Sequence, residues 1–227
     1  MPPRALEPAG VALVDKPAGP SSFAVVAQIR RLTGARTGHA GTLDPFATGL
    51  LLLLSGRTTK LVPWLVGLDK RYLTDVDLTA RTATGDPEGA VVETLQPPDE
   101  AALEERLALL RGEIELPVPA ASAVKIGGER AYRLARRGVE VEMPLRRSTV
   151  HTLDVIAYTG DAVTLDLRVS SGTYVRAIAQ ALGGHCRTLR RTEVGPFSVE
   201  DAVAPDAFEP ELLLAEADVL ARIGAHR

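Results

Sequence analysis

The chain has 227 residues, of which 45% are hydrophobic and 24% are charged, and its formal net charge is −3. This is the composition of a globular protein with one sizeable core, and no apolar run approaches the roughly 18 residues of a membrane span. The first residues lack the apolar segment of a signal peptide, and the one cysteine, Cys186, excludes an internal disulfide. We therefore expect a cytoplasmic protein without a membrane partner. The negative net charge argues against a general polyanion binder.

The first part of the chain predicts short strands and helices in irregular order. Hydrophobic periodicity and capping residues predict a strand over 11–14, a helix from Ser21 or Ser22 to about Leu32, a strand over 50–54, a helix over 59–68 and a strand over 72–78. The five leucines at 50–54 are too few and too closely bounded by glycine for a helix. They predict a strand that is buried on both faces.

The second part continues the mixture of element types. It predicts a turn at 87–89, a strand over 91–95, a helix over 99–111 capped by Asp99, a basic helix over 129–137, a hairpin of strands 149–157 and 162–170, a helix at 178–182 and a helix over 212–223. Strands and helices that do not alternate regularly indicate an α+β fold. No internal repeat is present.

Charge is distributed unevenly along the chain. The segment from Lys125 to Arg147 contains seven basic and three acidic residues, a local charge of +4. Smaller basic clusters lie at 30–36 and 187–191, whereas acidic residues gather at 86–105 and 200–218. Such asymmetry suits a protein with one RNA-facing side. A run of like charge is also compatible with a simple solvated face.

The stretch Gly38–Gly49 places one carboxylate, Asp44, in a glycine-flanked turn directly before the leucine strand. Glycines allow backbone angles closed to other residues and let a ligand come close. An acid presented in this way is a candidate nucleophile. The local pattern has a second interpretation, because Asp before Pro is a common helix start in which the carboxylate caps free amides.

The whole string resembles the central motif of the pseudouridine synthases, most closely that of the bacterial tRNA pseudouridine-55 synthases of the TruB family. The family motif G-H-x-G-x-L-D-P-x-A-x-G is filled here at every fixed position. Five further blocks match the family in the same order, namely 14–22, 69–72, 122–132, 171–176 and 189–197. The resemblance therefore covers residues 11 to 203.

The resemblance implies a pseudouridine synthase fold: a mixed, largely antiparallel central sheet with flanking helices and a basic thumb insertion that presses on RNA. We expect a catalytic domain over 1–205 with the thumb at about 120–147, and a short, helical tail over 206–227 in place of a full C-terminal PUA domain. The chain also departs from the family. Phe23-Ala24 stands where relatives often carry His-Asp or Asn-Asp, and Ala121 replaces an aromatic residue.

The resemblance assigns the catalytic residues as Asp44, Tyr72 and Arg176. Asp44 would be the nucleophile, and the guanidinium of Arg176 would pair with it and favour its charged form. The ring of Tyr72 would stack on the uracil, or its hydroxyl would help to remove the C5 proton. Without the resemblance, Arg176 would read as a surface salt bridge or a helix-start charge, and Tyr72 as a core residue of its strand.

Further residues would bind the substrate. His39 occupies the position from which the family contacts the nucleotides flipped out of the T loop. Tyr174 and Leu189 would line the pocket, although a leucine there is more often plain core. The motif lysines Lys16, Lys60 and Lys125 would contact either RNA phosphate or a structural carboxylate.

Pseudouridine formation oxidises nothing and transfers no group from outside, so no cofactor or metal is expected. His39, His151 and His185 and the single cysteine lack metal-ligand spacing. The resemblance thus implies an enzyme that isomerises uridine 55 in the T loop of tRNA, working as a monomer without an obligate protein partner. Two alternatives are a tRNA-folding chaperone with secondary catalysis and a guide-RNA-dependent synthase.

Overall fold

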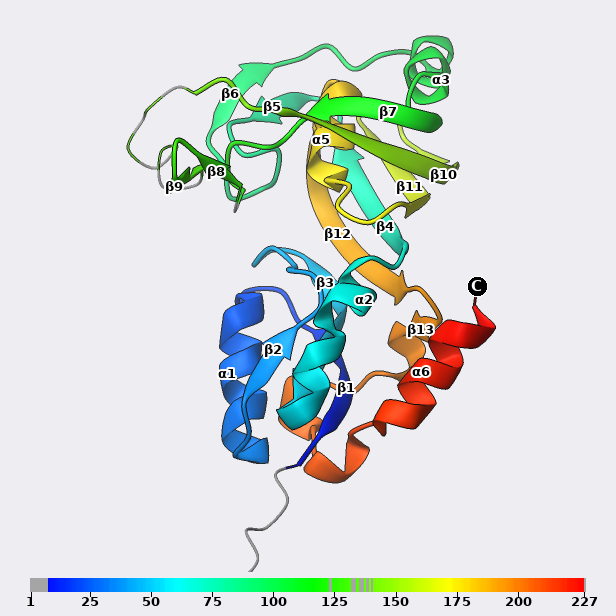
Figure 1. Ribbon diagram of the computed structural model, residues 1–227. Coiled ribbons are helices and arrows are strands. Elements are labelled where there is room, and N and C mark those ends of the chain that lie inside the picture. The colour runs from blue at the N-terminus through cyan, green and yellow to red at the C-terminus, as the bar shows by residue number, and fades with distance from the viewer. Residues whose placement is uncertain are drawn as a thin grey trace, which may run out of the picture. The chain divides into compact units, whose positions relative to one another are not determined.

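A computed structural model describes residues 8–122, 124–131, 134, 137, 139 and 141–226. The chain forms two compact units (Figure 1). Unit 1 consists of Met1–Arg71 and Arg190–Arg227, and unit 2 consists of Tyr72–Leu189. Strands β4 (Lys70–Asp77) and β12 (His185–Val194) belong to both units, because each runs across a boundary between them. Within the described ranges, every helix is too short or too polar to span a lipid bilayer.

Unit 1 combines three long strands with helices from both ends of the chain. Its elements are β1 (Gly10–Lys16), α1 (Ser22–Thr33), β2 (Thr37–His39), β3 (Thr48–Ser55), the 3-10 helix η1 (Gly56–Leu61), α2 (Val62–Val66), the end of β12, β13 (Phe197–Ser198), the 3-10 turns η2 (Val199–Asp201), η3 (Pro205–Ala207) and η4 (Pro210–Leu212), and α6 (Glu216–Ala225). The strands pair in the order β1-β3-β12, with β2 on β3 and β13 on β12. The pair β3–β12 is parallel.

The leucine run forms the centre of unit 1. Leu50 to Leu54 are all fully buried in β3, as predicted from their unbroken apolar character. Leu50, Leu52 and Leu54 share one hydrophobic cluster with Leu61 and Leu65 of η1 and α2 and with Val219 and Ile223 of α6. The side chains of Leu51 and Leu53, which alternate with these, point to the other face of β3, on which α1 contacts the strand. Residues 206–227, predicted as a tail, therefore contribute a helix to this core.

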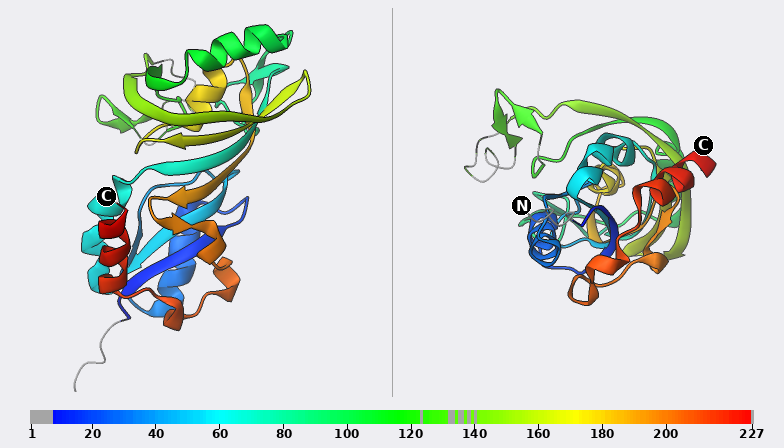
Figure 2. Two further views of the ribbon diagram at one scale, coloured as in Figure 1. Left: turned by 90° about the vertical axis from the view of Figure 1, so that its right-hand side faces the viewer. Right: turned by 60° about the horizontal axis from the view of Figure 1, so that its bottom comes forward.

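Unit 2 is built around a second set of strands. Its elements are β4 (Lys70–Asp77), β5 (Ala80–Thr82), β6 (Val91–Thr94), α3 (Glu100–Ala108), β7 (Gly112–Pro117), β8 (Lys125–Ile126), β9 (Glu129–Arg130), β10 (Leu145–Tyr158), β11 (Ala162–Val169), α5 (Val175–Ala181) and β12 (His185–Val194). The strands pair in the order β12-β4-β11-β10-β7, and the predicted hairpin is the antiparallel pair β10–β11. Figure 2 shows the same elements from two further directions. The predicted α+β fold with a mixed, largely antiparallel sheet is confirmed.

Some local predictions are wrong. Residues 41–47 form no helix, so Asp44 does not cap one. Glu129 and Arg130 form strand β9 rather than the start of the predicted basic helix, Ala131 and Leu134 within that range are helical, and positions 132, 133, 135 and 136 lie outside the described residues. The last helix begins at Glu216, because Leu214 instead bridges to Val11 at the edge of β1.

Candidate active site

The turn that carries Asp44 connects β2 to β3 in unit 1. Ser22, the first residue of α1, is buried and binds the turn with its hydroxyl group. This hydroxyl donates a hydrogen bond to the carbonyl of Leu43 at 2.8 Å and accepts one from the amide of Leu43 at 2.9 Å. The residue before the candidate nucleophile is therefore fixed on both sides of its backbone. The motif Ser21-Ser22 thus serves two purposes, since Ser21 caps α1.

Lys16 holds the other side of the same turn. Its ammonium group is fully buried and donates to the carbonyls of Ala47 at 2.7 Å, Pro45 at 3.1 Å and Pro17 at 2.7 Å. The expectation that Lys16 contacts RNA phosphate is wrong in this structure, because a buried ammonium that already binds three carbonyls is not available to a phosphate. Its contacts make it a residue that positions the Asp44 turn.

Arg191 supplies a third anchor that the sequence analysis missed. It is one of the most buried side chains of the protein, and it donates from Nε to the carbonyl of Leu50 at 2.8 Å and from a terminal nitrogen to that of Gly41 at 3.1 Å. Gly41 has φ +97°, a conformation that favours glycine. Two consecutive arginines in a ten-residue strand were the available signal, since one of them must face inward.

His39 lies at the end of β2, five residues before Asp44. Its ring meets the ring of Phe23 edge to face, with centroids 5.4 Å apart and planes at 86°. Its Nδ1 is buried and has no hydrogen-bond partner among the described residues. Burial, and to a smaller extent the positive charge of Arg191, lowers the pKa of the imidazole below its ordinary value. This shift favours the neutral form of the ring.

In unit 2, Arg176 is the second residue of α5 and is almost completely buried. Its guanidinium donates to the carbonyl of Thr84 at 2.8 Å, to Oδ2 of Asp86 at 3.2 Å and to the carbonyl of Ala121 at 3.0 Å. The alternative of a surface salt bridge is wrong, because both charges are buried. Asp44 belongs to unit 1 and Arg176 to unit 2, and the pairing between them stays a prediction.

Asp86 is a further residue that the sequence analysis missed. Its carboxylate is buried, with Oδ2 bound to Arg176 and Oδ1 accepting from the hydroxyl of Thr84 and the amide of Glu88. Every bond of this carboxylate comes from the loop after β5 or from α5. In the sequence it looked like the first member of an exposed acidic run, and only its burial distinguishes it.

The aromatic and apolar candidates are largely buried. Tyr72 lies on β4, whose side chains alternate between buried and exposed at this end, and Leu189 is buried on β12. Tyr174 precedes α5 and is half-buried. With Thr173, Gly172 and Arg146 it lines a cavity of about 10 Å³, large enough for a single water molecule. Arg146 packs against the backbone of the loop there, since a Cβ on Gly172 would lie 2.0 Å from its guanidinium.

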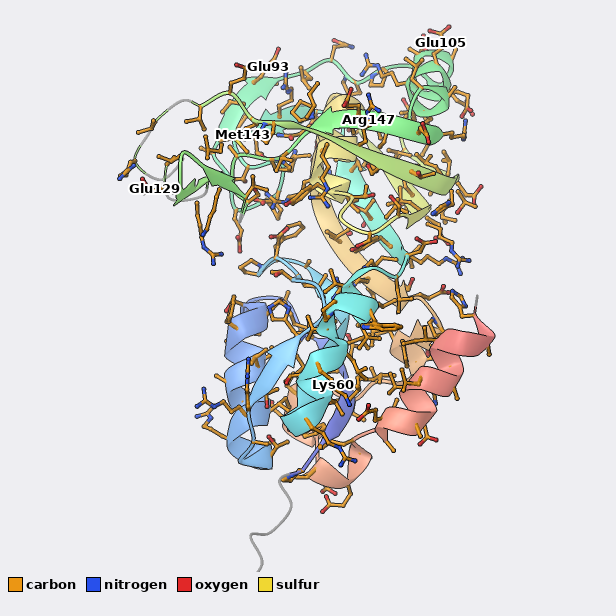
Figure 3. The ribbon with its side chains drawn as sticks, viewed as in Figure 1. Lys60, Glu93, Glu105, Glu129, Met143 and Arg147 are labelled. Atoms are coloured by element: carbon orange, nitrogen blue, oxygen red, sulfur yellow. The ribbon has the colours of Figure 1, made fainter. Side chains whose placement is uncertain are left out.

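The two remaining candidate lysines, Lys60 and Lys125, have different surroundings. Lys60 on η1 forms an ion pair with Glu216 of α6 at 2.8 Å, which is the structural carboxylate that we considered as an alternative to RNA. Figure 3 labels Lys60 on its helix. Lys125 is exposed on β8 and stands directly opposite Arg130 of β9. Two cations at one cross-strand position repel each other unless an anion lies between them.

Taken together, the architecture and the acid held in a rigid turn define the pseudouridine synthase class of proteins. The solved Cbf5-Nop10-Gar1 complex contains a chain of the same fold, with a TM-score of 0.66 and 28% identity over 86% of this chain and 52% of that one. A crystal structure of a pseudouridylate synthase matches with a TM-score of 0.51 at 19% identity, over 96% of this chain and 75% of that one.

The sequence comparisons are more specific. The model of the TruB family pseudouridylate synthases (N-terminal domain) matches residues 30–175. The tRNA pseudouridine synthase B of Leifsonia xyli subsp. xyli is 43% identical, over 92% of this chain and 74% of its own length. That of Thermobifida fusca is 44% identical, over 92% of this chain and 78% of its own. The chain belongs to the TruB family of pseudouridylate synthases. It spans about half the length of the Cbf5 chain that it matches.

Proposed function

We propose that this protein isomerises uridine to pseudouridine at position 55 in the T loop of tRNA. Relatives that match nine tenths of the chain carry the name tRNA pseudouridine synthase B. The observation that carries the proposal is the fixation of the Asp44 turn by Ser22, Lys16 and Arg191. Three buried anchors on one short turn are needed where a reactive group must be held in place.

Asp44 is the nucleophile of the proposed reaction. The N1–C1′ bond of the uridine breaks, the uracil turns, and a C5–C1′ bond forms with loss of the C5 proton, which is delivered to N1 so that no atom is gained or lost. A carboxylate attached for a time to the base or the sugar suffices for this sequence of steps. Arg176 keeps that carboxylate ionised, and Tyr72 stacks on the uracil or helps to take up the C5 proton. No cofactor or metal ion enters the reaction.

The target base must leave its stack before Asp44 can reach it. His39 contacts the nucleotides of the opened loop, and its neutral ring is suited to stacking. Tyr174 and Leu189 line the uracil pocket. The cations Lys125 and Arg130 contact phosphates of the RNA backbone, which relieves their mutual repulsion. Lys60 also contacts RNA, with Glu216 holding its side chain in the free protein.

The protein acts in the cytoplasm as a monomer without an obligate protein partner. Incubation with one unmodified tRNA transcript, followed by mapping of pseudouridine, tests both the reaction and its independence from other components. Asp44→Asn should abolish the product while the dissociation constant for tRNA changes less than about twofold, because the amide keeps the size of the carboxylate but not its nucleophilicity. Retained turnover in this variant would remove the nucleophile assignment.

A guide-RNA-dependent activity is the second candidate, since solved chains of the same fold come from a Cbf5-Nop10-Gar1 complex and from an H/ACA RNP bound to a substrate RNA. Pseudouridine on the naked transcript would exclude it. The chaperone alternative predicts that the Asp44→Asn protein still promotes tRNA folding, and a comparison of folding yields with the wild type separates that role from catalysis.

A further inference from the structure

Phe23 is an exposed aromatic ring of unit 1. It is the second residue of α1, and 68% of its surface is accessible, whereas Phe197 and Phe208 of the same unit are buried. A single exposed apolar side chain is ordinary in itself. The unusual feature is its neighbour, because the Phe23 ring packs at a right angle against the ring of His39.

Both rings are tied to the Asp44 turn by short connections. Ser22, next to Phe23 in the chain, binds both backbone groups of Leu43, the residue before Asp44. His39 ends a strand that pairs with the leucine strand after the turn, in the register His39–Leu53. The two rings therefore stand on rigid elements, and their distance from the turn is fixed by hydrogen bonds within unit 1.

Two perpendicular rings form a corner. A flat base that stacks on the face of one ring meets the other ring with its edge, and both contacts are favourable arrangements of aromatic groups. Stacking on an aromatic side chain accepts any base, because every base has a π-face. We propose that Phe23 and His39 form a stacking corner that holds an unpaired base of the RNA substrate beside the Asp44 turn.

The surface that surrounds Phe23 favours RNA over a protein partner. The exposed residues that follow on α1 are the small Ala24 and Ala27, then the cations Arg30 and Arg31, and finally Leu32 near the other end of the helix. An apolar protein interface would require a larger contiguous apolar patch. A single ring followed by guanidinium groups matches a base attached to a phosphate backbone. The corner rests on the proposed function in so far as it takes an RNA substrate.

The test measures binding and stacking separately from catalysis. All proteins in this test carry Asp44→Asn. The dissociation constant for an unmodified tRNA transcript is measured for the protein that retains Phe23 and for those that also carry Phe23→Ala, Phe23→Leu or Phe23→Trp. Loss of one stacked base should weaken binding roughly tenfold in Phe23→Ala. Phe23→Trp should restore it, and Phe23→Leu should not, because leucine is apolar but has no flat π-face.

A fluorescent base reports the stacking directly. With 2-aminopurine placed in turn at each unpaired position of the T loop, one position should be quenched on binding to the Phe23 protein and should brighten with Phe23→Ala. Trp64→Ala, which removes another exposed ring of unit 1, is the matched control and should change neither signal. Thermal unfolding of each variant verifies that the fold is kept, as expected for an exposed side chain.

The outcomes separate this inference from the proposed function. If the wild type forms pseudouridine but Phe23→Ala binds and quenches as Phe23 does, the stacking corner is refuted and the enzyme assignment stands. If Phe23→Leu binds as tightly as the wild type, the contact is merely apolar and the inference also fails. If the wild type makes no pseudouridine while Phe23→Ala still weakens binding and loses quenching, the corner stands and the reaction does not.

Discussion

At the scale of single residues, we expect the largest loss of stability when the ion pair of Arg176 and Asp86 is broken. Both charges are buried, and the pair is surrounded by backbone groups that complete its hydrogen bonding. A buried pair of this kind contributes little net stability compared with apolar residues, but it is costly to break by removing one partner. The pair also determines where the guanidinium of Arg176 is held in unit 2.

Replacement of Asp86 by Asn should therefore lower both stability and activity. The amide retains an acceptor but leaves the buried guanidinium without its carboxylate, which we expect to cost about 3 kcal/mol of the free energy of unfolding. Urea denaturation measures this loss, and the initial rate of pseudouridine formation should fall more than tenfold.

The control for this variant is Glu115→Gln, which removes the partner of Arg147 in an exposed pair. Such surface pairs contribute less than about 1 kcal/mol. If Asp86→Asn and Glu115→Gln lose equal amounts of unfolding free energy, burial does not set the cost of breaking the Arg176–Asp86 pair.

At the scale of elements, the parallel pairing of β3 with β12 depends on Gly49. This glycine has φ +103°, and a Cβ built on it would lie 2.2 Å from the carbonyl oxygen of Arg191. The two backbones can approach only because no side chain stands between them. The contact brings the strand of Arg191 to the beginning of β3, immediately after the Asp44 turn.

Gly49→Ala should accordingly destabilise unit 1 strongly. We expect a loss of about 3 kcal/mol or more, since the new methyl group collides with backbone and the positive φ is strained. Gly38→Ala is the matched control, because its Cβ would meet nothing within 4 Å. Thermal unfolding of both variants checks this. A Gly49→Ala protein as stable as the wild type would contradict the close approach.

Lys70 links α2 to β4 and makes this junction sensitive to pH. Its buried ammonium donates to the carbonyls of Val66 and Leu68. Burial, and to a smaller extent the charge of Arg191, lowers the pKa of Lys70 from 10.5 to about 8, although Asp69 opposes this. Between these two values the unfolded chain binds more protons at this position than the folded chain does. The contribution of Lys70 to stability therefore rises as the pH increases from about 8 to 10.5.

The direction of this pH dependence can be measured with the variant Lys70→Met. The free energy of unfolding of the wild type minus that of the variant should increase between pH 8 and pH 10.5 and stay constant below that window. Lys125→Met, the same change at an exposed lysine, controls for the loss of one charge. A difference that falls with rising pH would show that Lys70 is stabilised in its charged form.

At the scale of the whole molecule, the basic surfaces should make tRNA binding depend on salt. The described cations of the predicted thumb include Lys125 and Arg130, which stand opposite each other on β8 and β9, and α1 adds Arg30 and Arg31. Each phosphate contact contributes about 0.7 to 0.9 to the slope of log affinity against log salt concentration. Lys125→Ala should reduce the magnitude of that slope by about 0.7 to 0.9, the contribution of one phosphate contact. A flat profile in the wild type would mean that these cations form only a solvated face.

Several elements could be predicted from local patterns because their causes are local. Ser21 caps α1 and Asp99 caps α3 as expected, and the leucine run forms the buried strand. The β12 strand and the short β2 strand were missed, since neither has a clear alternating pattern. The alternative interpretation of Asp44 as a helix start is excluded, because the tertiary contacts of Lys16 and Ser22 with the same turn override the capping signal of Asp-Pro.

The sequence by itself determined the family, the α+β class and the identity of the candidate nucleophile, because these depend on residue types in a fixed order along the chain. Only the tertiary structure decided that Lys16 binds carbonyls, that Arg191 is buried beneath the turn and that Asp86 is the partner of Arg176. The physical reason is that the role of a charged side chain is set by its burial and its neighbours. Apart from Pro17, which is adjacent to Lys16, those neighbours lie from 29 to 150 residues away in the chain, beyond the reach of any local pattern.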